Sequence, residues 1–235
     1  MKLFALHLLL STTSLLSNIV SNSLHEQQLK GNIKCLNHSF LSNKEGKELK
    51  YSERYCFDKW GNEIAYYRYH GDSIVRYDTT TYTLALNGQR IEGKTASSIN
   101  AESKNIIYRY DEKGRLKEKY IYTGKGLPNG LWQYKYDTAN NRVLITNIGK
   151  GELLPSATTY DRDGNKISEE NFGGYMDTYS YDKDGALETV TIRCHEGDFV
   201  TRYLNIVLDD HKNWTKRTST CEGRKTLETR IITYY

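Results

Sequence analysis

The chain has 235 residues, with 33 Lys and Arg against 29 Asp and Glu, which gives a net charge of +4 at neutral pH. Because the two signs are balanced and interspersed, charge gives no reason to expect nucleic acid or an anionic membrane as a partner. The 20 tyrosines and only 2 prolines are typical of strand-rich proteins. The length suits one all-β domain or one repeat array.

The chain begins with Met1 and Lys2, an apolar run from Leu3 to Leu16 and a short polar segment. This order is typical of a secretory signal peptide. We therefore expect residues 1–23 to be removed and the protein to be exported, whether periplasmic, on the cell surface or secreted. The run is shorter than the roughly 20 apolar residues of a membrane span, so we expect no transmembrane segment after cleavage. An uncleaved amphipathic anchor is the alternative.

Residues 24–56 are expected to form an N-terminal capping hairpin. Cys35 and Cys56 flank the turn signal SNKEGK, so a hairpin folded there places the two thiols opposite each other. An even number of cysteines in an exported chain favours disulfides. Pairing of Cys194 with Cys221 stays open, because the expected strand 199–208 would lie between them and separate them by nearly 10 Å.

Residues 57–235 carry a repeated turn motif in about seven units. The aspartates at 111, 137, 161, 182 and 209 follow one another at intervals of 26, 24, 21 and 27 residues, and 53 residues separate Asp58 from Asp111. A degenerate unit, LALNGQR at Leu84–Arg90, falls in the long gap. Fixed periods of this kind indicate a repeat architecture.

The motif has a physical reason. An aspartate that opens a turn accepts hydrogen bonds from the following backbone N–H groups, and a glycine three residues later takes positive φ without strain. Asn140 or Asn141, and Asn213, are candidates for the left-handed position in the two units without that glycine. The expected turn residues are Asp58, Gly61, Asp111, Gly114, Asp137, Asp161, Gly164, Asp182, Gly185 and Asp209.

Alternating tyrosine, threonine, valine and isoleucine flank these turns, and no long segment after residue 23 keeps a helical apolar period. We therefore expect an all-β fold, an antiparallel β-hairpin repeat array that forms an extended, twisted or partly curled meander sheet. A modest apolar content of 37% fits a single sheet better than a closed sandwich.

At Tyr108–Leu116 the sequence YRYDEKGRL resembles the hallmark of the YD-repeat family, also called RHS repeats, and YSYDKDGAL at Tyr179–Leu187 follows it more loosely. The resemblance implies the architecture of a short exported member without a C-terminal toxin. Large members coil into a shell, and we expect seven units to be too few for that. The family's repeats carry no catalytic residues, so the resemblance transfers none.

Motifs for chemistry are weak. The glycines in DRDG at Asp161 and DKDG at Asp182 are fourth in the loop and not sixth as in a calcium loop. Cys194, His195 and Glu196 are adjacent residues that alternate faces on a strand. Glu169 with Glu170, or Asp209 with Asp210, would be the acid and base of a sugar hydrolase, but solvated strand ends are the better interpretation. We expect no metal and no cofactor.

The aromatic residues beside the turns, Trp60, Trp132 and Trp214, are the candidate binding residues, because exposed aromatic rings stack on sugars or anchor protein partners. Packing between strands is the alternative role. The sequence thus predicts a non-enzymatic exported scaffold that binds a protein or a glycan. A hydrolase acting on cell-surface polysaccharide or peptide, and a purely structural envelope component, are the two alternatives.

Overall fold

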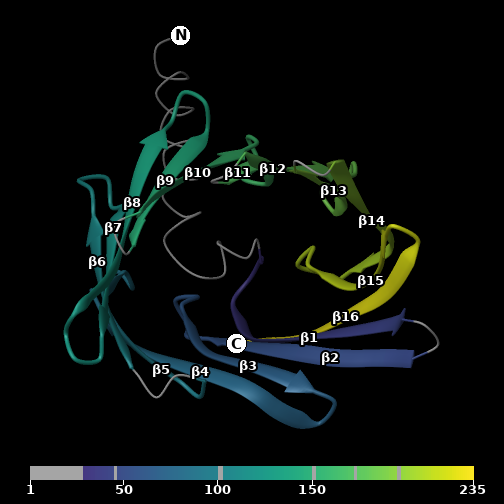
Figure 1. The fold of residues 1–235 in the computed structure, drawn as a ribbon, viewed down its shortest axis with the longest axis horizontal. Coiled ribbons are helices and arrows are strands. Elements are labelled where there is room, and N and C mark those ends of the chain that lie inside the picture. Colours follow the sequence, from purple (N-terminus) through teal and green to yellow (C-terminus); the bar gives the residue numbers. More distant parts are fainter. Residues whose placement is uncertain (1–28, 45–46, 100–102, 150–151, 172–173, 195–196) are drawn as a thin grey trace.

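A computed structural model describes residues 29–44, 47–99, 103–149, 152–171, 174–194 and 197–235. Within these residues the protein is all-β (Figure 1). No helix in these ranges is long and apolar enough to cross a membrane. Residues 1–23, assigned above to a signal peptide, lie outside the described part. The strands are β1 (Ile33–Lys44), β2 (Lys47–Phe57), β3 (Glu63–His70), β4 (Ser73–Leu84), β5 (Arg90–Ser97), β6 (Lys104–Tyr110), β7 (Leu116–Thr123), β8 (Pro128–Asp137), β9 (Arg142–Gly149), β10 (Glu152–Tyr160), β11 (Lys166–Asn171), β12 (Tyr175–Tyr181), β13 (Leu187–Cys194), β14 (Gly197–Leu208), β15 (Trp214–Cys221) and β16 (Arg224–Tyr234).

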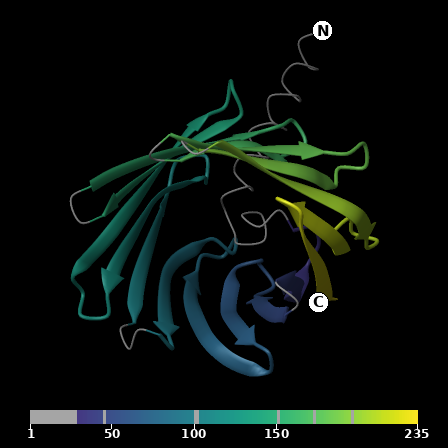
Figure 2. The ribbon, with the colours of Figure 1, turned by 45° about the vertical axis from the view of Figure 1, so that its right-hand side comes forward.

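Every strand pairs antiparallel with its neighbours in the chain, and β1 also pairs with β16, so the sheet closes into a barrel. The ring of strands is visible in both ribbon views (Figures 1 and 2). The expected all-β antiparallel hairpin meander is confirmed. The expectation that seven units are too few to close is wrong, because the N-terminal hairpin and β16 complete the ring. Closure removes both sheet edges, which would otherwise expose unpaired backbone groups.

Seven turns of one kind lie at one rim of the barrel and join β2 to β3, β4 to β5 and so on to β14 and β15. At Asp58, Asp111, Asp161, Asp182 and Asp209, one carboxylate oxygen accepts from the backbone N–H groups two and four residues later, at 2.8–3.0 Å. Asn87 accepts from the N–H of Gln89 in the degenerate unit. We call this rim the Asp-turn rim.

In each unit a residue at the end of the turn takes positive φ, and it lies three or four positions after the aspartate, or directly after Asn87 in the degenerate unit. Gly61, Gly114, Gly164 and Gly185 have φ between 76° and 86°, where a side chain would be strained. Asn141 supplies this conformation in the Asp137 turn, with φ of 49°. In the Asp209 turn it is Lys212, with φ of 65°, and not Asn213. Asn213 is instead buried and bonded to the N-terminal segment.

Residues that lie directly opposite each other on paired strands share one face of the sheet, so this face can be followed from strand to strand around the ring. Glu228 on β16 faces Arg217 on β15 and Phe40 on β1. Side chains of this face from separate strands, Tyr181 on β12 and Arg230 on β16 among them, line one cavity. Strands so far apart can share a cavity only inside the ring, so this is the lumen face.

Tyrosines on the lumen face connect several of the units to the one before them. In three units a tyrosine hydroxyl group donates to the backbone carbonyl that lies five residues after the turn aspartate of the preceding unit. A cation near the end of one turn also stacks on a tyrosine of the following unit, which contributes about 0.5–1 kcal/mol per pair. The hydrogen bonds are Tyr82 to Glu63 (3.0 Å), Tyr136 to Leu116 (2.8 Å) and Tyr181 to Lys166 (2.8 Å), and the stacks are Arg90 on Tyr108, Arg115 on Tyr136 and Lys166 on Tyr179.

Barrel closure is reinforced where the two ends of the described chain meet. The amide of Asn213 donates to the carbonyl of Lys30 and its oxygen accepts from the N–H of Lys30. The Tyr234 hydroxyl donates to Asp209, the aspartate of the last turn. A buried cluster of Leu29, Ile33, Leu36 and Phe57 lies beside this junction. The N-terminal segment is therefore fastened to the Asp-turn rim.

The Cys35–Cys56 disulfide joins directly opposite residues of β1 and β2, as the hairpin predicted. Cys194 and Cys221 are free thiols. Cys221 lies opposite Thr201, which lies opposite Val190, so β14 separates the two cysteines and Cys194 is four residues further along β13. Two strand spacings of nearly 5 Å and this offset exceed the reach of a disulfide.

Replacement of a turn aspartate tests the repeat chemistry. D161A removes the acceptor for two backbone N–H groups and for the Asn165 amide, so we expect a loss of about 1–2 kcal/mol in the free energy of unfolding. D163A is the matched control, because its carboxylate accepts no hydrogen bond in the described part of the chain. Urea denaturation of both variants measures the difference, and equal losses would contradict this role.

Candidate functional site

A cavity of about 210 Å³ opens on the lumen face near the Asp-turn rim. It combines two aromatic rings, four cations, two side-chain amides and a small aliphatic floor. We call it the rim pocket. Its lining residues are Lys30, Asn165, Tyr181, Gly185, Ala186, Leu187, Leu208, Lys212, Asn213, Trp214, Arg217 and Arg230.

Trp214 is the centre of the rim pocket. The guanidinium carbons of Arg217 and Arg230 lie 3.9 Å and 3.7 Å from its ring centroid. Arg217 also lies 3.7 Å from the ring of Tyr203 on β14. Such stacking holds long side chains in place without consuming their N–H donors.

Glu228 holds the Arg217 side chain in place. Its carboxylate accepts from the Arg217 Nε and Nη2 atoms at 3.0 Å and 2.8 Å, and both side chains are almost fully buried. Burial alone would raise the pKa of Glu228, but the contact with His38 and the charge of Arg217 lower this pKa to about 2. The carboxylate is therefore ionised at neutral pH.

His38 on β1 lies against the same group. Its Nε2 atom is 3.3 Å from the Glu228 carboxylate, and its ring packs on Phe40 and edge-on against Trp214. Burial lowers the pKa of His38 below its usual 6.5, and Arg230 and Arg217 act in the same direction against the opposing effect of Glu228. The folded protein thus resists protonation of His38, so stability falls as the pH drops below about 6.5.

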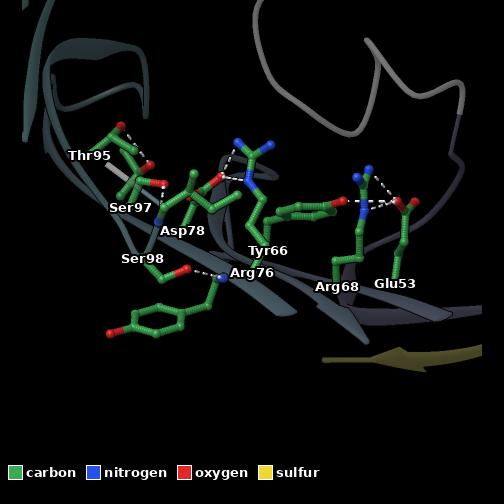
Figure 3. A network of polar contacts seen from close by, with 11 residues as sticks. Glu53, Tyr66, Arg68, Arg76, Asp78, Thr95, Ser97 and Ser98 are labelled. Atoms are coloured by element: carbon green, nitrogen blue, oxygen red, sulfur yellow. Dashed lines mark hydrogen bonds and ion pairs between the residues drawn. The ribbon is translucent and has the colours of Figure 1, made fainter. Parts of the chain in front are cut away.

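A second polar network covers the lumen face of β2 to β5 (Figure 3). Glu53 accepts from the hydroxyl groups of Tyr55 and Tyr66 at 2.7 Å and 2.8 Å and from Arg68. Arg76 pairs with Asp78 beside it at 2.6 Å. Both oxygens of Glu53 accept hydrogen bonds from these neighbours, and one oxygen of Asp78 pairs with Arg76.

The three candidate tryptophans do not come together. Trp214 lines the rim pocket, while Trp60 lies in the first Asp turn, 40% exposed, with its ring against Gly88 of the next turn. Trp132 lies on β8 near the ammonium group of Lys119. The turn aspartates and glycines all lie at the Asp-turn rim, where Asn165 and Gly185 also contribute to the pocket wall.

Sequence reasoning missed the charged members of the site, Arg217, Glu228, Arg230 and His38. One signal was available. Along β16, Glu228 and Arg230 share the parity of Ile232 and Tyr234, so charged and apolar side chains point to the same face. Charged residues at inward positions are unusual unless paired, and this pattern marks an interior polar cluster.

The carboxylate pairs considered from sequence are separated. Glu169 contacts Lys166 at 2.7 Å, whereas Glu170 points to the other face and contacts Arg142 at 2.6 Å. Asp209 accepts the backbone hydrogen bonds of its own turn. No group of three or more His, Cys, Asp or Glu side chains is placed to hold a metal ion within the described ranges. His195 and Glu196 lie outside those ranges.

No protein-family model matches the chain, and no curated protein matches it. Among solved structures, a porin-like protein from Bacteroides uniformis is similar with a TM-score of 0.48 and 12% identity, over 87% of this chain and 99% of that one. TcdB2-TccC3 is similar with a TM-score of 0.31 and 11% identity, over 80% of this chain and 16% of that one. TcdB2-TccC3 without its hypervariable C-terminal region gives 0.31 and 12%, over 80% and 15%. The chain thus spans a small part of TcdB2-TccC3, and similarity at these values carries no argument about function.

The buried ion pair predicts a specific pH dependence. A pKa lowered from 4.5 to about 2 corresponds to about 3 kcal/mol of stability, present at neutral pH and lost as the pH falls from about 5 through 2. E228Q should therefore be less stable than the native protein by about this amount at pH 7, and the difference should shrink towards pH 2. Chemical denaturation across that pH range measures it.

E170Q is the control for this prediction, because the Arg142–Glu170 pair is exposed and contributes little. A gap between the native protein and E228Q that stays constant from pH 7 to pH 2 would refute the assignment.

Proposed function

We propose that the chain is an exported, non-enzymatic barrel of the YD-repeat type that binds a glycan in the rim pocket. The observation that carries the proposal is the pocket lining, in which Tyr181 and Trp214 stand beside the amide of Asn165 and four cations. Aromatic rings stack on the apolar face of a sugar, and amides and cations bond its hydroxyl groups.

The dimensions of the pocket favour a glycan over a protein partner. Its volume of about 210 Å³ lies below the roughly 300 Å³ at which sites for drug-sized ligands begin. A single sugar residue at the end of a chain suits such a space. A protein partner needs an interface of about 800 Å² on each side, which a small concave pocket on the lumen face does not offer.

The state of the lumen carboxylates supports a binding role. A general acid needs a carboxyl group whose pKa is raised towards the working pH. Burial alone would raise the pKa of Glu53, but hydrogen bonds from Tyr55, Tyr66 and Arg68 lower it. The pKa of Glu228 is lowered to about 2. Such groups position neighbours and hold no proton to donate.

Export fits two further features. The Cys35–Cys56 disulfide is typical of oxidising compartments outside the cytoplasm. The outer face carries exposed charges within strands on several sides of the ring, namely Arg54, Lys94, Lys135, Glu170 and Lys216. A lipid-facing barrel needs an outward apolar band about 25 Å tall, so these charges favour an aqueous surrounding.

One observation favours the hydrolase alternative. Asp177 on β12 lies directly opposite Glu169 on β11. Burial and the nearby charge of Glu169 raise the pKa of Asp177 above its ordinary value. Opposed carboxyl groups, one of them with a raised pKa, are the elements of acid–base cleavage of a glycosidic bond.

Replacement of Trp214 tests the binding proposal. We expect the native protein to bind members of a glycan array and W214A to lose at least tenfold in affinity by calorimetry, because the ring that holds Arg217 and Arg230 in the pocket wall is gone. W60A and W132A are the matched controls and should bind normally. W214F keeps an aromatic ring and should retain most of the affinity, which separates lost stacking from misfolding.

A panel of polysaccharide and peptide substrates tests the alternative. Under the binding proposal no substrate is turned over. Turnover that D177N abolishes while W214A leaves it intact would establish the hydrolase and end the binding proposal.

A further inference from the structure

The rim pocket carries an unbalanced positive charge. Lys30, Lys212, Arg217 and Arg230 line it, and no carboxylate belongs to its lining among the described residues. The carboxylate of Glu228, which is not part of the lining, accepts two hydrogen bonds from guanidinium N–H groups, and both come from Arg217. One carboxylate therefore lies near two guanidinium groups and is bonded to one of them.

Arg230 is the group left over. In the described part of the chain it makes no hydrogen bond or ion pair, and its Nε atom is buried without a partner. The stack on Trp214 holds the guanidinium in place at 3.7 Å while leaving its N–H donors free. An oriented cation with unused donors beside a cavity is the arrangement that binds a planar anion through two parallel hydrogen bonds.

The electrostatic environment of Arg230 agrees with this geometry. Burial lowers the pKa of its guanidinium to about 9, and the neighbouring Arg217 acts in the same direction. A guanidinium stays protonated at neutral pH, and the charge of Glu228, which acts to raise this pKa, does not offset the effect of burial. A bound anion would offset more of it.

We propose that the rim pocket binds the carboxylate of an acidic sugar residue, with Arg230, which the Trp214 ring holds in place, as its anchor. This inference rests on the proposed glycan-binding function and specifies its ligand class. Lys30 and Lys212, at the rim, add an attractive field for anionic chains. Arg217 acts as a positioning residue, because its donors are occupied by Glu228.

The test compares an oligogalacturonate with the same oligosaccharide after reduction of its carboxyl groups, by calorimetry on the whole protein. We expect the native protein to bind the acidic form at least tenfold more tightly. R230Q should lose this preference while its affinity for the reduced form stays unchanged. R202Q, which removes an exposed arginine from the outer face of β14, is the matched control and should keep the preference.

Stability provides the second readout. Because Arg230 has no ion pair in the described structure, R230Q should melt at the same temperature as the native protein or higher, so a loss of preference cannot be attributed to unfolding. Equal affinity for the acidic and reduced forms would overturn the carboxylate assignment and leave glycan binding standing. Preference for a sulfated oligosaccharide over the carboxylated one would also overturn it. Binding to no glycan at all would remove the proposed function as well.

Discussion

The rest of the structure depends on a turn in which one aspartate oxygen accepts from the backbone N–H groups two and four residues ahead. This contact fixes a tight reversal with a residue at positive φ, and it recurs at one rim of the sheet. Because five of the seven reversals share this geometry, the hairpins that they join are related by nearly the same rotation. A strand ribbon with a constant twist and a constant turn curls, and here it curls until β16 meets β1.

The turns also decide what faces the lumen. Four of the seven, those at Asp58, Asn87, Asp111 and Asp161, place a cation or carbonyl just past their end, in contact with a tyrosine of the following unit. The interior is therefore a lining of tyrosine, arginine and carboxylate groups with small apolar clusters, and not an oily core. Such a lining needs each polar group to be paired. The Nε atom of Arg230 is one of several buried polar atoms in the described residues at which the pairing is incomplete, and the proposed ligand would lie beside it.

Much of this follows from the sequence. Asp111 with Gly114, and Asp182 with Gly185, identify hairpin turns by local chemistry alone, and the Cys35–Cys56 bridge follows from one hairpin. Closure does not, because it depends on pairing between Ile33 and Tyr234, about 200 residues apart, and on the summed curvature of all the strands. The same holds for the rim pocket. Trp214 was identifiable as an aromatic residue beside a turn. Its arginine partners lie on β15 and β16, and they could be assigned to the pocket only once it was known which face of the closed sheet points inward.

Closure is the central claim, and engineered crosslinking across the β1–β16 seam tests it most directly. Ser39 and Thr229 are directly opposed there, at a Cα separation within disulfide range. In a background with Cys194 and Cys221 replaced by serine, S39C/T229C should form an intramolecular disulfide on mild oxidation, detected by peptide mass spectrometry. S39C/L204C, which places the second cysteine two strands beyond β16, should not. Failure of the first pair to crosslink within one molecule, or equal crosslinking of both pairs, would contradict a closed barrel.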